Sequence, residues 1–93
     1  MELGDFQDLI GRTYGSRDAE RGIAATVAWL AEEVGELAKA ARKGTVDEQL
    51  EELADVLAWT VSLATQLGLD AEQAVSRYAG GCPKCHAIPC ACA

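Results

Sequence analysis

Apolar side chains recur at helical spacing along most of the chain, and glycines separate the apolar segments. This pattern predicts helices over residues 2–14, 18–43, 47–67 and 70–78. No segment has the sustained alternation of polar and apolar residues that a half-buried strand requires. Both prolines lie in the last dozen residues, so neither interrupts a predicted helix. We therefore expect an all-α protein.

The two longest predicted helices each carry one continuous apolar stripe. The stripes comprise Ile23, Val27, Leu30, Val34, Leu37 and Ala41 in the first of them, and Leu50, Leu53, Leu57, Thr60, Ala64 and Leu67 in the next. Gly44 and Gly68 end these helices, and the short connection between them favours an antiparallel hairpin within a four-helix bundle. The first of the two would be roughly 36 to 39 Å long, which is long for so small a core. We therefore expect a homodimer or homotetramer, in which helices of another subunit complete the bundle.

The fourth predicted helix is short and leads into a tail of different composition. Asp70 suits the N-cap of this helix, and Ala71, Ala74 and Val75 are expected to face inward. The pair Gly80-Gly81 ends the helical pattern. We therefore expect one helical domain over residues 1–79 and a cysteine-rich tail over residues 80–93.

The charge of the chain excludes one large class of function. The 93 residues include 15 acidic and 8 basic side chains, which gives a formal net charge of −7. A general nucleic-acid binder is disfavoured, because affinity for phosphates comes from clustered Lys and Arg. An acidic surface instead attracts cations, or polyanions that arrive with a metal. The chain also lacks a charge-free apolar run of about 18 residues and the blocks of a signal peptide, so we expect a soluble cytoplasmic protein that does not bind membranes.

Carboxylates on the two long helices are the main candidate site. Asp55 is the only charged residue between positions 53 and 69, and a carboxylate in so apolar a helix is costly unless it is paired or binds a metal. Glu52 lies three residues earlier, and Glu33 and Glu36 repeat this spacing on the other helix. Two acidic pairs that face each other would repel without a cation, and oxygen donors are what Mg²⁺ or Mn²⁺ selects. A solvated acidic face would show the same spacing, but the apolar surroundings of Asp55 favour a metal site.

The arrangement of these acids resembles a known family. Glu32-Glu33-x-x-Glu36, a spacer of 15 residues and Glu52-x-x-Asp55 resemble the signature of the MazG-like all-α nucleoside triphosphate pyrophosphohydrolases. The resemblance extends over most of residues 1–79, and it includes the segments 29–38 and 51–57 around these acids.

The resemblance implies a reaction and an assembly. The reaction is Mg²⁺-dependent hydrolysis of a nucleoside triphosphate between the α and β phosphates, which gives the monophosphate and pyrophosphate. The assembly is a homodimer or a dimer of dimers with sites near subunit contacts. By position, the resemblance makes Glu33, Glu36, Glu52 and Asp55 metal ligands, and Glu32 a ligand of a second metal or a group that orients water.

Other residues are candidates for binding the substrate. Trp29 and Trp59 lie on the same general side of their helices as the acids, where they would hold the base or else serve core or dimer packing. Arg21 and Lys39 are the candidate phosphate contacts, chosen from a set of basic residues in and around these helices. The others in that set are Arg17, Arg42, Lys43 and Arg77.

All four cysteines lie in the tail. Cys82, Cys85, Cys90 and Cys92 form a C-x-x-C and a C-x-C pair within eleven residues. Two such pairs wrap a tetrahedral Zn²⁺, and His86 is an alternative ligand to one of them. Redox-active or disulfide-forming thiols, or thiols without metal, are the other interpretations.

Two alternatives to the leading function therefore stand beside it. One is phosphoribosyl-ATP pyrophosphohydrolase, an all-α enzyme of related design. The other is a non-catalytic helical adaptor that binds a partner protein through a zinc-containing tail. Substitution of Glu36 or Asp55 separates an enzyme from an adaptor.

Overall fold

The computed structural model describes residues 1–93, which form helices and turns without any strand. Its elements are α1 (Leu3–Arg21), α2 (Ile23–Lys43), α3 (Val46–Gln66), α4 (Ala71–Val75) and the 3₁₀ helix η1 (Ser76–Tyr78). The expectation of an all-α protein with four helices is confirmed. None of these helices is both long enough and apolar enough to span a bilayer.

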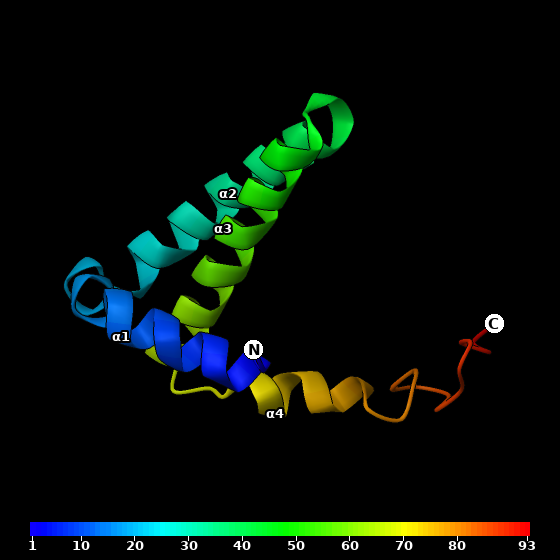
Figure 1. The fold of residues 1–93 in the computed structure, drawn as a ribbon. Helices are drawn as coiled ribbons and strands as arrows, with labels where there is room; N and C mark the ends of the chain where they lie inside the picture. Colours follow the sequence, from blue (N-terminus) through cyan, green and yellow to red (C-terminus); the bar gives the residue numbers. More distant parts are fainter.

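Helices α2 and α3 form an antiparallel hairpin, which is the longest feature of the molecule (Figure 1). The turn between them is fixed by capping. The backbone N–H of Gly44 donates to the carbonyl of Ala40 at 2.8 Å and ends α2. Thr45 then caps α3, because its hydroxyl accepts from the backbone N–H of Glu48 at 3.2 Å while the Glu48 carboxylate accepts from the Thr45 backbone at 3.2 Å. Two consecutive helices with one tight turn must run side by side, so residues on their facing sides meet.

The boundary between the first two helices differs from the prediction. Helix α1 continues through Gly15 to Arg21, and α2 begins at Ile23, whereas the sequence pattern indicated a break near Gly15 and a second helix from residue 18. The break lies at Gly22, whose φ of 84° and ψ of 164° are essentially restricted to glycine. Gly15 stays within the helix, at a cost of about 0.5–1 kcal/mol relative to alanine. Asp18 and Arg21 therefore belong to the end of α1 and not to α2.

Helix α1 crosses the base of the hairpin and anchors α4 (Figure 1). The Gln7 side chain donates to the Leu69 carbonyl at 2.9 Å and accepts from the Ala71 backbone N–H at 2.8 Å. Asp70 caps α4 as predicted, with its carboxylate accepting from the Glu72 backbone N–H at 2.9 Å. The predicted inward orientation of Ala74 and Val75 is wrong for the isolated chain, since both are exposed and α4 contacts α1 and the adjoining η1.

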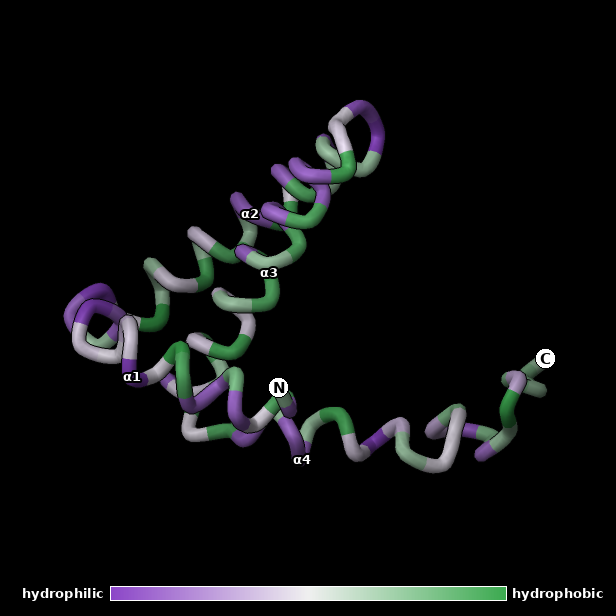
Figure 2. The backbone as a smooth tube through the Cα atoms, viewed as in Figure 1, coloured by the Kyte–Doolittle hydropathy of each residue, from purple (hydrophilic) through white to green (hydrophobic).

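The chain alone buries little apolar surface. Ala40 and Val61 are its only buried hydrophobic residues, and members of both stripes such as Val34 and Leu50 are 49% and 61% exposed. Hydrophobic segments run along the whole hairpin in Figure 2. The surface area is 6670 Å², whereas about 5,200 Å² is expected for a compact monomer of this mass, an excess of roughly 1,500 Å². The four helices therefore do not close into a compact bundle within one chain.

Candidate functional site

Three carboxylates meet between the two helices of the hairpin. Glu33 on α2 and Glu52 and Asp55 on α3 each contribute one oxygen to a group whose atoms all lie within 4.8 Å of one another. The spacing of three residues places Glu52 and Asp55 on one side of α3, and the antiparallel packing brings Glu33 opposite them. All three residues are half-buried. We call Glu33, Glu52 and Asp55 the acidic cluster.

The acidic cluster is electrostatically strained without a cation. Partial burial, a hydrogen bond with the Glu52 carboxyl and the charges of Asp55, Glu52 and Glu36 raise the pKa of Glu33 from 4.5 to about 7. One oxygen of Glu52, Oε2, is buried and has no hydrogen-bond partner, and an unsatisfied carboxylate oxygen is costly to bury. A divalent cation would both accept that lone pair and offset the repulsion. The donor set consists of oxygens only, which fits Mg²⁺ or Mn²⁺.

The other two candidate acids lie outside this cluster. Glu36 is exposed, but its charge contributes to the raised pKa of Glu33. It also lines, together with Glu52, Lys39 and Lys43, a cavity of about 200 Å³ next to the hairpin turn. Glu32 is exposed on the outer side of α2. The structure thus brings together three of the four predicted metal ligands, and keeps Glu36 at the edge of the same region.

An aromatic pair lies across the same two helices. The rings of Trp29 and Trp59 stack with their centroids 6.1 Å apart and their planes 10° apart. The Arg21 guanidinium carbon lies 4.8 Å from the Trp59 ring centroid, which is the geometry of a cation–π contact. We call Trp29 and Trp59 the aromatic surface, and the positive charge of Arg21 lies over the Trp59 ring.

A second cavity joins this aromatic surface to the acidic cluster. It measures about 210 Å³, and Asp55 lines it together with Trp59 and Arg21. The other residues that line it are Tyr14, Arg17, Asp18, Ala58 and Ser62. Asp55 is thus shared between the acidic cluster and the cavity. A ligand in this cavity would meet the Asp55 carboxylate, two arginines and an indole face.

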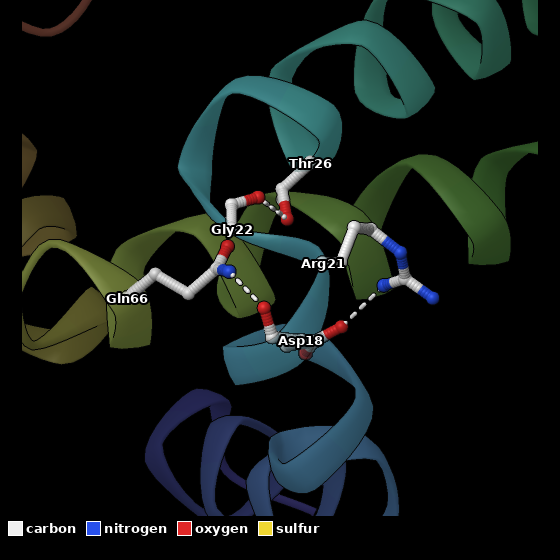
Figure 3. Close-up of polar contacts among 5 residues, drawn as sticks. All are labelled: Asp18, Arg21, Gly22, Thr26 and Gln66. Carbon is white, nitrogen blue, oxygen red and sulfur yellow. Dashed lines mark hydrogen bonds and ion pairs between the residues drawn. The ribbon is translucent and has the colours of Figure 1, made fainter.

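The junction between α1 and α2 holds Arg21 in position (Figure 3). Its guanidinium donates to the Asp18 carboxylate at 2.6 Å. Asp18 is only 5% exposed, and its carbonyl accepts from the Gln66 side chain at 2.7 Å. Thr26 is fully buried, and its hydroxyl donates to the Gly22 carbonyl at 3.1 Å. These contacts tie the end of α1 to α3, so Arg21 stays beside Trp59.

Sequence reasoning missed Tyr14 and Ser62 as cavity residues and assigned no role to Asp18 or Thr26. Tyr14, Asp18 and Arg21 are spaced by four and three residues, which places them on one face of a continuous helix. This signal was hidden because the prediction ended the first helix at Tyr14. Recognising Gly22 as the break would have revealed it.

The four cysteines form a separate group far from the acidic cluster along the chain. Cys82, Cys85, Cys90 and Cys92 place their sulfurs within 4.8 Å of one another. They lie in the tail, which extends away from the hairpin beyond α4 (Figure 1). His86 is not part of this group.

Comparison with known proteins identifies a family for most of the chain, from the last residue of α1 into the start of the tail. The model of the MazG nucleotide pyrophosphohydrolase domain matches residues 21–84. This match spans more than half of the chain and includes the acidic cluster, both tryptophans, Arg21 and Lys39. No curated protein matches the chain.

Proposed function

The chain belongs to the MazG nucleotide pyrophosphohydrolase family, and from this we propose that it hydrolyses nucleoside triphosphates between the α and β phosphates. The products are the nucleoside monophosphate and pyrophosphate, and the reaction requires Mg²⁺, for which Mn²⁺ substitutes. The observation that carries this proposal is the acidic cluster, which shares Asp55 with the cavity beside Trp59 and Arg21. The proposed role is removal of surplus or noncanonical nucleotides in the cytoplasm.

The acidic cluster would hold the metal. Glu33, Glu52 and Asp55 would supply ligands, and the resemblance to the family makes the exposed Glu36 a further one. When bound, Mg²⁺ neutralises phosphate charge and aligns the phosphate for attack by water. Phosphoryl transfer depends on such positioning and charge stabilisation, so the site needs no covalent nucleophile. In this proposal Glu32 orients water or binds a second metal from the rim.

Basic residues on both sides of the acidic cluster would bind the polyphosphate. Arg21 lines the cavity that contains Asp55, and Lys39 lines the cavity that contains Glu52. A triphosphate that bridges the acidic cluster would therefore meet a positively charged side chain at each end. This arrangement explains how a chain with a net charge of −7 binds a polyanion.

The aromatic surface of Trp29 and Trp59 would hold the base. Stacking of a base on an aromatic side chain contributes about 1–3 kcal/mol and tolerates different bases. A stacking surface contacts the face of a base and does not by itself read the hydrogen-bonding groups at its edge. The aromatic pair thus supports binding of nucleotides as a class.

We propose that a homodimer or homotetramer is the active form. Sites for small ligands usually enclose about 300–1,000 Å³, whereas the cavity beside Asp55 measures about 210 Å³. The excess exposed area of roughly 1,500 Å² is similar to what one subunit buries in a large interface. A second copy packed on the exposed stripes would cover Val34 and Leu50 and deepen the site.

The test is product analysis with purified protein and Mg²⁺. The substrates are a panel of ribo- and deoxyribonucleoside triphosphates together with phosphoribosyl-ATP, and pyrophosphate is scored separately from orthophosphate. We expect pyrophosphate and the matching monophosphate from at least one triphosphate. Turnover of phosphoribosyl-ATP alone would favour the alternative within the same reaction class.

Two variants locate the activity. Asp55→Asn should abolish pyrophosphate release, because it removes a charge shared by the acidic cluster and the cavity. Glu51→Gln is the matched control, since this exposed neighbour of Glu52 lies outside the cluster. No turnover with either Mg²⁺ or Mn²⁺ by folded protein would contradict the proposal and favour the non-catalytic adaptor.

A further inference from the structure

The tail contains a group of donors that the proposed hydrolysis does not use. The sulfurs of Cys82, Cys85, Cys90 and Cys92 all lie within 4.8 Å of one another. The Cys82 and Cys92 sulfurs are 3.6 Å apart. A zinc ion with four sulfurs at about 2.3 Å in tetrahedral geometry keeps neighbouring sulfurs about 3.8 Å apart. The measured separation therefore matches one edge of such a tetrahedron.

We propose that Cys82, Cys85, Cys90 and Cys92 bind one Zn²⁺ per chain as a structural tetrathiolate site that is separate from the acidic cluster. Four thiolates are soft ligands and leave no open position, which is the composition of structural zinc sites. The site organises the segment from Cys82 to Cys92 into a closed knuckle. Catalysis at the acidic cluster does not involve this zinc.

The backbone around the sulfurs is arranged as it is in a metal knuckle. The first cysteine pair closes a tight turn, in which the His86 backbone N–H donates to the Cys82 carbonyl at 2.7 Å and the Cys82 N–H donates to the Ala87 carbonyl at 3.2 Å. The Ala91 backbone N–H donates to the Cys85 sulfur at 3.3 Å, which ties the second half of the tail to the first. Backbone donors to sulfur stabilise thiolates and fix their direction.

Gly81 allows the tail to fold back on itself before the first cysteine. Its φ is 100°, and a Cβ at this position would lie 2.8 Å from the Ala87 carbonyl oxygen and 2.7 Å from an Ile88 side-chain carbon. Any larger residue would push the two halves of the knuckle apart. The close approach of Gly81 to Ala87 thus supports a closed loop around the sulfurs.

The geometry argues against the disulfide interpretation. All four cysteines are free, and the Cys82–Cys92 separation of 3.6 Å far exceeds the bond length of about 2.0 Å. His86 is exposed and stands outside the group, so the geometry also favours four sulfur ligands over three sulfurs and an imidazole.

The experiment measures metal content and ligand type in the full chain. Protein purified under reducing conditions from zinc-supplemented medium is analysed for metals and then by X-ray absorption at the zinc edge. We expect one zinc per chain, with four sulfurs at about 2.3 Å. Absence of zinc, iron in its place, or nitrogen or oxygen ligands would overturn the proposal.

Variants of the tail provide the second measurement. The double variant Cys82→Ser/Cys85→Ser should lose its zinc while keeping the far-UV helical signal of the domain, because the cysteines lie outside every helix. His86→Asn is the matched control, since asparagine tolerates the positive φ of 58° at this position. It should retain one zinc. Loss of zinc in His86→Asn, or retention in the double variant, would refute the four-cysteine site.

Discussion

The acidic cluster and the cysteine knuckle are built in opposite ways. The oxygens of the cluster come from Glu33, Glu52 and Asp55, which only the packing of α2 against α3 brings within 4.8 Å. The sulfurs of the knuckle come from eleven consecutive residues, 82–92, and their own backbone turns bring them together. The first site therefore depends on tertiary structure, whereas the second depends on local chain geometry.

This difference has consequences for the chemistry of each site. Carboxylates that are held by a hairpin can accept a substrate-bound cation and release it, which suits hard Mg²⁺ with its retained waters. Four closely spaced thiolates enclose a soft cation and leave no position open for substrate. Within one small chain, catalytic and structural metal sites can thus be separated by donor type.

Substitution of Glu52 should damage only the acidic cluster. Glu52→Gln removes the negative charge of a carboxylate whose Oε2 is buried without a hydrogen-bond partner. We expect kcat/KM to fall at least 100-fold, which corresponds to a loss of about 2.7 kcal/mol of transition-state stabilisation. Steady-state kinetics on the best triphosphate, with zinc analysis alongside, checks this. Zinc content should not change. Activity within threefold of the wild type would show that Glu52 does not bind the metal.

The backbone conformation at the break between α1 and α2 should contribute to the stability of the helical domain. Gly22→Ala forces a side chain into a glycine-only conformation and should lower the free energy of unfolding by about 1–3 kcal/mol. Gly15→Ala is the matched control inside α1, where a Cβ meets nothing within 4 Å, and it should raise that free energy by about 0.5–1 kcal/mol. Urea unfolding monitored by circular dichroism measures both. Equal effects of the same sign would contradict the observed helix boundary.

The aromatic surface should affect substrate binding more than chemistry. Trp59→Ala removes the ring that stacks on Trp29 and lies beside Arg21, and we expect KM to rise about tenfold, or 1.4 kcal/mol. Trp59→Phe keeps an aromatic face and should retain most of the affinity. Initial rates over a range of triphosphate concentrations separate KM from kcat. If kcat fell while KM stayed constant, Trp59 would have a positioning role and would not bind the base.

The stability of the metal-free cluster should depend on pH through Glu33. The folded protein holds this proton up to about pH 7, while the unfolded chain releases it near 4.5. Because the folded state binds more protons between these values, stability should fall as the pH rises through this window, by on the order of 1 kcal/mol after solvent screening. Urea unfolding in Mg²⁺-free buffer at several pH values tests this. Glu33→Gln should flatten the dependence, and an identical slope in this variant would assign the effect to other groups.

The sequence predicted the helices well where periodicity was strong. The stripes of α2 and α3 and the caps around Gly44 and Asp70 are local features, so they could be recognised without a structure. The α1–α2 boundary could not, because Gly15 and Gly22 look alike in a sequence. They differ in backbone conformation, because Gly22 has a φ of 84° whereas Gly15 is helical.

The same distinction applies to the two sites. The spacing of Glu52 and Asp55 already placed them on one side of a helix, but the contact of Glu33 with both of them required the register of the hairpin. Tyr14 entered the cavity only because α1 extends further than its periodicity indicated. The grouping of the cysteines needed no tertiary information, because all four lie within one short loop.

Mn²⁺ binding provides the most direct test of two separate metal sites. Free Mn²⁺ is titrated by electron paramagnetic resonance against the wild type, Asp55→Asn and Cys82→Ser/Cys85→Ser, each without nucleotide, because a triphosphate would itself bind Mn²⁺. We expect the wild type and the cysteine variant to bind Mn²⁺ alike, whereas Asp55→Asn should not bind it in the same concentration range. Equal binding by Asp55→Asn, or loss of binding in the cysteine variant, would contradict this expectation.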